Sequence, residues 1–251
     1  MSFVYDNILY ILFLRDDIIF YCMSEKVKLA VFDFDGTIIP SQSGMKLSLD
    51  LVKTGQLNKR TTIRLIFWGL RYKAHLPYKE RVPRELIFRP FTGKNSEEVN
   101  EYIDNFYAEN LDKTVRGRLI EIADELKQDG YEPVILSAAF TSTLNSFSKR
   151  HGFVHIVGTE MSVDDEGNYT GKVEGECVAG DEKLRRLYEY ADNTFGVDNW
   201  EIEYAFADHY TDLDLLNQAN YVCAVDPDKT LRKHAKKNDW EILDFEKGEV
   251  A

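Results

Sequence analysis

Two aspartates, Asp33 and Asp35, follow an apolar run that begins at Leu29. Side chains two residues apart on a strand point to the same face, so both carboxylates can address one site. Gly36 and Thr37 come directly after them and form a turn at which backbone can approach a ligand closely. Carboxyl groups placed in this way can bind a hard cation, transfer protons or act as nucleophiles. They could also simply end a strand, so the pattern needs support from elsewhere in the chain.

Polar residues at three later points of the chain give that support. They are Ser137 after Val134-Ile135-Leu136, Lys183 after Gly180-Asp181-Glu182, and Asp208 and Asp212 after the apolar run that ends at Ala207. Each one alone is more often a strand-end hydroxyl, a solvated lysine or a helix cap. As an ordered set after predicted strands they resemble the four motifs of the haloacid dehalogenase superfamily, whose members are mostly phosphatases and phosphotransferases.

The resemblance implies phosphoryl transfer through an aspartyl phosphate. Asp33 is expected to be the nucleophile, and Asp35 the acid that protonates the leaving group and then the base that activates water. Because negative groups converging on a phosphate repel it, Mg²⁺ is the expected cofactor. The resemblance assigns the ion to Asp33, the backbone carbonyl of Asp35, and Asp208.

The other motif residues are expected to support the transferring group. By resemblance, Ser137 and the backbone N–H of Ala138 bind a phosphoryl oxygen. Lys183 neutralises charge on the nucleophile and the phosphoryl group, and Asp212 orients the cluster. The expected enzyme is a magnesium-dependent phosphomonoester hydrolase acting on a small phosphorylated substrate.

Within the superfamily the chain resembles subfamily IB hydrolases, relatives of phosphoserine phosphatase, from about Lys28 to Phe245. The likeness rests on helices inserted after the first motif, on the segment Gly171 to Gly175, and on Asp226-Pro227-Asp228. Phosphoserine phosphatases carry a Glu nine residues after the nucleophile, where this chain has Gln42, and a glycine pair in place of Ala138-Ala139. Gln42 has no charge to meet a substrate ammonium, which favours a phosphomonoester other than phosphoserine. Phosphoserine phosphatase proper stays open as the alternative.

Strands alternate with helices along most of the chain, which is typical of an α/β fold with a doubly wound parallel sheet. We expect strands at 29–32, 133–137, 153–157, 203–207, 221–225 and near 242, helices at 114–128, 141–151, 181–191, 211–219 and 227–237, and a hairpin over 161–173. Residues 41–113 show helical apolar spacing broken by Gly and Pro, and predict an all-helical cap domain of about four helices. The core domain is then 23–40 and 114–251.

The cap segment is also basic. From Lys53 to Lys94 there are eleven Lys or Arg against two Glu, a local charge of +9 in a chain whose formal net charge is −12. Arg71 and Arg84, together with Gln42, are the candidate substrate-binding residues of this region. The charge could attract an anionic substrate or allow weak contact with an anionic lipid surface, or it could be an ordinary solvated helix face.

Composition limits the remaining possibilities. The 251 residues are 44% hydrophobic, ample for a folded core, and the acidic balance disfavours nucleic acid as a partner. Three cysteines without metal-like pairing suggest neither a disulfide framework nor zinc, and favour the cytoplasm.

The apolar run Ile8 to Leu14 is too short to span a bilayer and lacks signal-peptide flanks. Residues 1–22 are therefore an extension of uncertain status, either a mis-assigned start or an element packed on the body. The oligomeric state is not predicted.

Other activities fit the sequence less well. A phosphotransferase would use the same aspartyl phosphate with a hydroxyl acceptor, and it stays open. Haloalkanoate dehalogenation would leave Asp35 without an oxygen to protonate. A transport ATPase would need membrane spans. A phosphoryl-accepting signalling domain would need neither Asp35 nor the insert.

Overall fold

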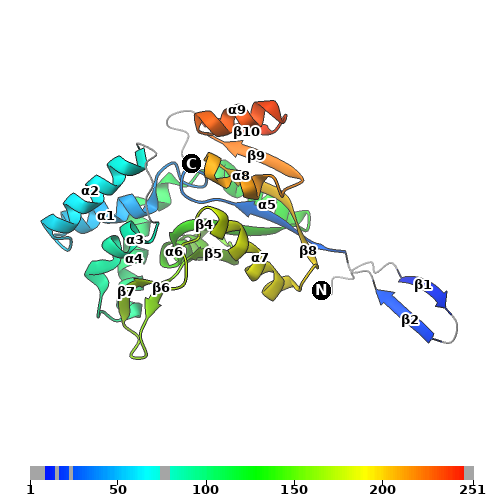
Figure 1. The fold of residues 1–251 in the computed structure, drawn as a ribbon, viewed down its shortest axis with the longest axis horizontal. Helices are drawn as coiled ribbons and strands as arrows, with labels where there is room; N and C mark the ends of the chain where they lie inside the picture. Colours follow the sequence, from blue (N-terminus) through cyan, green and yellow to red (C-terminus); the bar gives the residue numbers. More distant parts are fainter. Residues whose placement is uncertain (1–8, 15–16, 23–24, 74–79, 246–251) are drawn as a thin grey trace.

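A six-stranded parallel sheet forms the centre of the protein (Figure 1). The computed structural model describes residues 9–14, 17–22, 25–73 and 80–245, with side chains in 25–69 and 80–245. The strands lie in the order β10-β9-β8-β3-β4-β5. Their bounds are β3 (Val27–Phe32), β4 (Glu132–Phe140), β5 (His155–Thr159), β8 (Trp200–Ala207), β9 (Tyr221–Val225) and β10 (Glu241–Leu243).

Helices cover both faces of this sheet. They are α5 (Gly117–Gln128) and α6 (Thr141–His151) on one face, and α7 (Asp181–Phe195), α8 (Leu213–Leu216) and α9 (Lys229–Lys237) on the other. Strand β3 shows why: Leu29 and Val31 pack in the cluster that contains α7 and α9, whereas Ala30 and Phe32 pack in the cluster that contains α5 and α6. Successive side chains of a strand point to opposite faces, so a wholly apolar strand must be covered twice. The predicted doubly wound α/β fold is confirmed.

Four α-helices occupy the described part of the insert between β3 and α5. They are α1 (Ser43–Lys53), α2 (Lys59–Lys73), α3 (Arg81–Phe88) and α4 (Ser96–Asn110), with 3-10 turns at Arg89–Phe91 and Asp112–Thr114. These elements are of the expected type. The division of the chain into a core domain and a cap domain stays a prediction.

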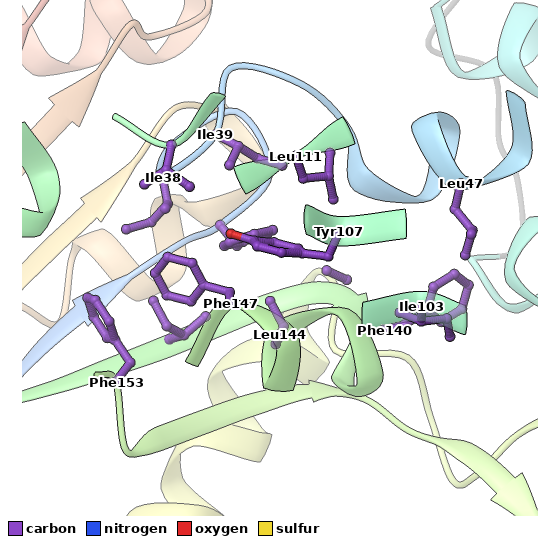
Figure 2. Close-up of a cluster of buried hydrophobic side chains, with 14 of the residues drawn as sticks. Ile38, Ile39, Leu47, Ile103, Tyr107, Leu111, Phe140, Leu144, Phe147 and Phe153 are labelled. Carbon is purple, nitrogen blue, oxygen red and sulfur yellow. The ribbon is translucent and has the colours of Figure 1, made fainter. Parts of the chain in front are cut away.

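The base of the insert shares its core with one face of the sheet. Figure 2 shows Ile103 and Tyr107 of α4 beside Leu144 and Phe147 of α6, and all four are buried in one hydrophobic cluster. Apolar area removed from water at this junction stabilises the insert and the sheet together. The insert is therefore packed against the sheet through α4.

An antiparallel hairpin makes a second junction with the insert. It consists of β6 (Met161–Val163) and β7 (Tyr169–Val173), where the sequence predicts a hairpin. Gly93 N donates to Tyr169 O at 2.8 Å, and Tyr169 N donates to Lys94 O at 2.9 Å. The hairpin thus hydrogen-bonds to the turn before α4, although more than seventy residues separate Lys94 from Tyr169 in the chain.

Residues near the N-terminus form a separate two-stranded sheet of β1 (Leu9–Leu14) and β2 (Asp17–Cys22). Figure 1 shows its backbone beyond the end of the main sheet, on the side away from α1 and α2. The status of residues 1–22 as an extension or as an element packed on the body stays a prediction. None of the described helices is both long and apolar enough to cross a bilayer.

Several predicted boundaries were wrong: α7 ends at Phe195 and not at 191, β8 begins at Trp200 and not at 203, and α8 is Leu213–Leu216 and not 211–219. Strand β5 begins at His155 and not at Phe153, because the Phe153 ring packs edge-on against Phe32 at 5.9 Å before the chain joins the sheet. Strand β4 continues past Ser137 to Phe140, through an irregularity in its pairing with β5. Helix α5 begins at Gly117 and not at Thr114, because a 3-10 turn precedes it.

Candidate active site

The turn after β3 brings Asp33 and Asp35 to the carboxyl edge of the sheet. Asp33 N donates to Phe206 O of neighbouring β8 at 2.9 Å, and Gly36 N closes the turn on Ile39 O at 2.7 Å. Gly36 has φ of +95°, and a Cβ atom there would lie 2.1 Å from Asp208 Oδ2. Only glycine permits both this conformation and this approach. The turn is therefore shaped to receive a second carboxylate.

Lys183 joins two of the acids. Its Nζ donates to Asp33 Oδ1 at 2.8 Å and to Asp212 Oδ2 at 2.9 Å, and all three side chains are buried. Burial lowers the pKa of the Lys183 ammonium, but Asp212 and Asp33 together raise it above its ordinary value. Burial raises the pKa of the Asp33 carboxyl, and Lys183 opposes that rise. The lysine is thus a fixed cation between two acids.

Asp33 and Asp208 converge on a single hydroxyl group. Thr37 Oγ1 lies 3.3 Å from Asp33 Oδ2 and 3.4 Å from Asp208 Oδ1. Burial, followed by the charges of Asp33 and Asp212, raises the pKa of Asp208 to about 8. Three carboxylates therefore share one ammonium, and the cluster is short of positive charge.

A hard divalent cation fits this donor set. It prefers oxygen ligands and would supply the missing charge beside Asp33 and Asp208. The backbone carbonyl of Asp35 is a third oxygen at the same turn, and Gln42 Nε2 lies 3.5 Å from it. Among the described residues no three His, Cys, Asp or Glu side chains form a metal cluster, and this donor set needs only two.

The Asp35 carboxyl is held by the first residue of α1. Oδ1 accepts from Ser43 N at 2.8 Å, and Oδ2 lies 3.0 Å from Ser43 Oγ. Burial raises the pKa of Asp35 to about 7, against the lowering effect of the bonds from Ser43. A carboxyl group with this pKa can both give and take a proton near neutral pH.

Ser137 stands at the carboxyl edge of the strand next to β3. Its side chain is buried, and its Oγ accepts from Ala139 N at 3.3 Å. As an acceptor in that bond, the hydroxyl keeps its own hydrogen to donate. The Ala138 carbonyl accepts from Thr159 Oγ1 and from Arg84 Nε, each at 3.0 Å. These bonds fix the backbone that follows the serine.

The acids, Lys183 and Ser137 line one cavity of about 330 Å³ between the sheet edge and the insert. The predicted site residues that line it are Asp33, Asp35, Gln42, Arg84, Ser137, Ala138, Lys183, Asp208 and Asp212. The insert adds the largely apolar side chains of Met45, Trp68, Pro83 and Ile87. The side chain of Arg71 lies outside the described residues.

Arg84 is not a free cation in this cavity. Its Nη1 donates to Glu80 O at 2.8 Å and forms an ion pair with the Glu80 carboxylate, one helical turn earlier. This ion pair was not predicted from the sequence. The bonds of Ser43 to Asp35, of Thr37 to Asp33 and Asp208, and of Arg116 to the turn after Asp35 were not predicted either. An acid four residues before a basic residue was a signal for the Glu80–Arg84 pair. No local pattern marks the other three.

Arg116 hydrogen-bonds to the backbone of the turn that follows Asp35. Its Nη1 donates to Gly36 O at 2.6 Å and to Thr37 O at 2.7 Å, and its Nη2 forms an ion pair with Asp226. Its guanidinium lies over the Phe245 ring at 4.6 Å. The side chain is buried, so these contacts replace water entirely.

A family model for haloacid dehalogenase-like hydrolases matches residues 30–217. The chain belongs to this family. It is 26% identical over 220 residues to the inhibition of morphological differentiation protein of Streptomyces azureus, covering 86% of this chain and 78% of that protein. It is 25% identical over 223 residues to a histidinol-phosphatase of Neisseria meningitidis serogroup C, covering 86% of this chain and 98% of that one.

Several solved structures share the fold. A protein of unknown function from Bordetella pertussis Tohama I superposes with a TM-score of 0.77 at 20% identity, covering 87% of this chain and 99% of its own. A substrate-bound phosphoserine phosphatase complex gives a TM-score of 0.57 at 18% identity, covering 88% and 93%. The predicted superfamily and the class of phosphatase-type hydrolase are confirmed.

Proposed function

We propose that the protein is a magnesium-dependent phosphomonoesterase that works through an aspartyl phosphate on Asp33. The observation that carries the proposal is the pair of differently held acids. Burial raises the pKa of both acids, but Lys183 lies 2.8 Å from Asp33 and is placed to stabilise its charged form, whereas the Asp35 carboxyl is held by the N–H and hydroxyl of Ser43. Two acids of different character on one edge suit a nucleophile and a proton donor.

In the first half-reaction an Asp33 oxygen attacks phosphorus as the bond from phosphorus to the leaving oxygen breaks. The Asp35 carboxyl gives its proton to that oxygen, so the alcohol leaves neutral. In the second half-reaction water attacks the same phosphorus, Asp35 takes a proton from it, and the bond to Asp33 breaks. Asp33 and Asp35 are then restored and inorganic phosphate is released.

The other residues stabilise charge on the transferring group. Ser137 donates its hydroxyl hydrogen to a phosphoryl oxygen, and the N–H of Ala138 is proposed to do the same. Lys183 neutralises Asp33 and a second phosphoryl oxygen, while Asp212 keeps the lysine in place. Asp33, Asp208 and the Asp35 carbonyl would hold Mg²⁺, which supplies positive charge to the phosphoryl oxygens when bound.

The cavity suits a small phosphorylated substrate. Relatives are named histidinol-phosphatase and phosphoserine phosphatase, which are names for the hydrolysis of phosphate esters of two different alcohols. The family alone therefore does not fix the leaving group. Gln42 lies at the cavity and carries no charge for a substrate ammonium, which supports a substrate other than phosphoserine. We propose that residues 41–113 act as the cap that covers this substrate.

Phosphate release from a panel of phosphomonoesters, with Mg²⁺ or with EDTA, tests the proposal. We expect Mg²⁺-dependent release, no turnover by Asp33→Asn, and turnover by Asp35→Asn slowed about 10² to 10⁴-fold. Rapid quench with a labelled substrate should trap phosphate on Asp33. Asp165→Asn, in the exposed turn of the β6–β7 hairpin, is the matched control and should match the parent. Full activity of Asp33→Asn, or label on another residue, would contradict the assignment.

A further inference from the structure

Helix α2 exposes apolar side chains on the face where a surface helix carries polar ones. Ile63 is 65% exposed, Ile66 60% and Phe67 62%. Their spacing of three and four residues puts them on one side of the helix, while Thr61 is buried on the other side. An amphipathic helix on the surface of a globular protein usually packs its apolar stripe against the core. In α2 the stripe of Ile63, Ile66 and Phe67 faces away from the core.

Helix α1, joined to α2 by residues 54–58, repeats the arrangement. Met45 is 48% exposed, Leu49 53% and Val52 40%, at a spacing of four and three residues. Leu47 and Leu51 on the opposite side are fully buried. Helix α1 therefore has two apolar sides, one buried and one exposed. Exposed apolar patches of this kind mark interaction surfaces.

The charge around these stripes is of one sign. From Lys53 to Lys73 the chain has six basic residues and no acidic residue, within a protein of net charge −12. At 100° per residue, Arg60 and Arg64 fall beside the Ile63–Phe67 stripe. Both are exposed, as is Lys59. Apolar side chains bordered by Lys and Arg form the pattern of a helix that lies in a membrane interface.

We propose that the outer face of α1 and α2 docks on an anionic lipid surface. This docking face consists of Met45, Leu49, Val52, Ile63, Ile66 and Phe67, with Lys53, Lys59, Arg60 and Arg64 around them. The six apolar side chains enter the boundary between head groups and acyl chains, and the basic side chains meet the lipid phosphates. Both contributions are needed, because neither a small apolar patch nor a few charges bind a membrane stably alone.

Charge complementarity favours lipid over a second copy of the chain. A symmetric dimer would place the same surface patch of each copy opposite the other and bring its basic residues together. An anionic bilayer offers negative charge and an apolar interior to the same face. The docking face also borders the catalytic cavity, since Met45 lines it and so does Trp68, the residue after Phe67.

Co-sedimentation with vesicles tests the proposal without any measurement of activity. The full chain is mixed with vesicles of phosphatidylcholine alone, or with one part phosphatidylserine to two parts phosphatidylcholine, at low and high salt. We expect binding to the anionic vesicles at least about ten-fold stronger than to neutral ones, and weaker at high salt. The triple variant Ile63→Ser, Ile66→Ser, Phe67→Ser, and the double variant Arg60→Glu, Arg64→Glu, should each lose most of it.

The matched control is Val154→Ser with Val197→Ser, which removes side chains 73% and 72% exposed outside the docking face. This variant should bind like the parent. Circular dichroism melts confirm that each variant is folded, and hydrolysis of a water-soluble phosphomonoester is followed separately. Equal binding to neutral and anionic vesicles, or parental binding by both docking-face variants, would overturn the proposal. So would a dimer in light scattering that the triple variant abolishes, because the face would then join two copies.

Discussion

The buried guanidinium of Arg116 ties the catalytic turn to the C-terminal part of the chain. It bonds the carbonyls of Gly36 and Thr37, pairs with Asp226 and covers Phe245. A planar group with five N–H donors can serve several acceptors at once, which a lysine ammonium on a flexible stem cannot do equally well. The turn that carries the proposed catalytic carboxylates is therefore held by a residue that does not line the cavity.

We expect Arg116→Met to lower the free energy of unfolding by about 3 to 5 kcal/mol, because it leaves the Asp226 carboxylate and two carbonyls without their partner. Urea unfolding at neutral pH measures the loss. The control is Arg118→Met, two residues later, where the guanidinium is 50% exposed and pairs with exposed glutamates. The free energy of unfolding of that variant should match the parent's, because exposed ion pairs contribute little. Equal losses in the two variants would show that the buried contacts add nothing.

The sequence predicted which polar residues meet, but not how each is held. Asp33 follows β3, Asp208 follows β8, and Ser137 lies in the last part of β4. These parallel strands are neighbours in the sheet, so the convergence of the three residues was a consequence of strand order. Arg116 could not be found in this way. Its acceptors lie 80 and 110 residues away in the chain, and nothing in the local sequence distinguishes it from an exposed arginine before a helix.

At the level of elements, the contact between α4 and α6 joins the insert to the sheet. Asp104 of α4 accepts two bonds from Arg150 of α6, at 2.8 and 3.0 Å. The Arg150 guanidinium lies 5.4 Å from the centre of the ring of Tyr107, which belongs to the hydrophobic cluster shown in Figure 2. Polar and apolar contacts therefore reinforce each other at one helix pair.

We expect Asp104→Asn to cost about 1 kcal/mol of stability at pH 7, a value reduced for the partial exposure of the pair. The bonds from Arg150 lower the pKa of Asp104 to about 2 from an ordinary 3.8. A lowered folded-state pKa gives stability that is complete above the unfolded value and is lost as pH falls through about 2. The difference between parent and variant should therefore shrink by about half between pH 7 and pH 3.

Urea unfolding at pH 7, 5 and 3 measures this difference. Glu189→Gln is the control, because its pair with Arg185 is more than half exposed on both sides. That variant should differ little from the parent at any of the three pH values. A cost of Asp104→Asn that stays constant down to pH 3 would contradict the proposed ionic origin.

Tyr107 gives a second test of the same helix pair. The ring is fully buried, and its hydroxyl has no hydrogen-bond partner among the described residues. Removing a buried hydroxyl without a partner should cost nothing, so Tyr107→Phe should be as stable as the parent or more stable by up to about 1 kcal/mol.

The matched comparison is Tyr169→Phe, which is also buried but donates to Asn100 Oδ1 at 2.8 Å. That change should destabilise by about 1 kcal/mol, because it leaves the Asn100 oxygen without its donor. Thermal melts of the two variants against the parent distinguish the sites. Equal destabilisation would mean that the Tyr107 hydroxyl is in fact satisfied.

Element types were predictable, whereas several ends were not. Apolar period and turn residues set α6, which ends at the left-handed Gly152, and the β6–β7 hairpin at the positions expected. The start of β5 depends on Phe153 packing against Phe32, a contact between residues more than a hundred apart. Tertiary contacts of this kind leave no mark in a local window.

At the level of the whole molecule, charge is unevenly distributed. The window from Lys53 to Lys94 carries +9, and the rest of the chain carries the balance of a −12 total. The sequence predicts this asymmetry but not its use. In the structure Arg84 turns inward and pairs with Glu80, whereas Lys59, Arg60 and Arg64 of α2 are exposed, as are Lys53, Arg89 and Lys94 outside that helix.

Removal of residues 1–22 should leave the unfolding midpoint and the turnover number unchanged. Strands β1 and β2 pair with each other in a sheet of their own, and the main sheet begins with β3, which pairs with β4 and β8. Melting curves and phosphate release of a chain that begins at Met23 test this. A large drop in either value would show that the hairpin is needed by the body of the protein.

Helix α1 carries two features at once. Its first residue, Ser43, binds both oxygens of Asp35, and its outer side carries Met45, Leu49 and Val52. An α-helix of eleven residues moves as a rigid rod, so a shift or rotation imposed on its outer side also moves its first turn. A displacement of α1 at the protein surface would therefore also move Ser43 and the carboxyl group of Asp35 that it holds.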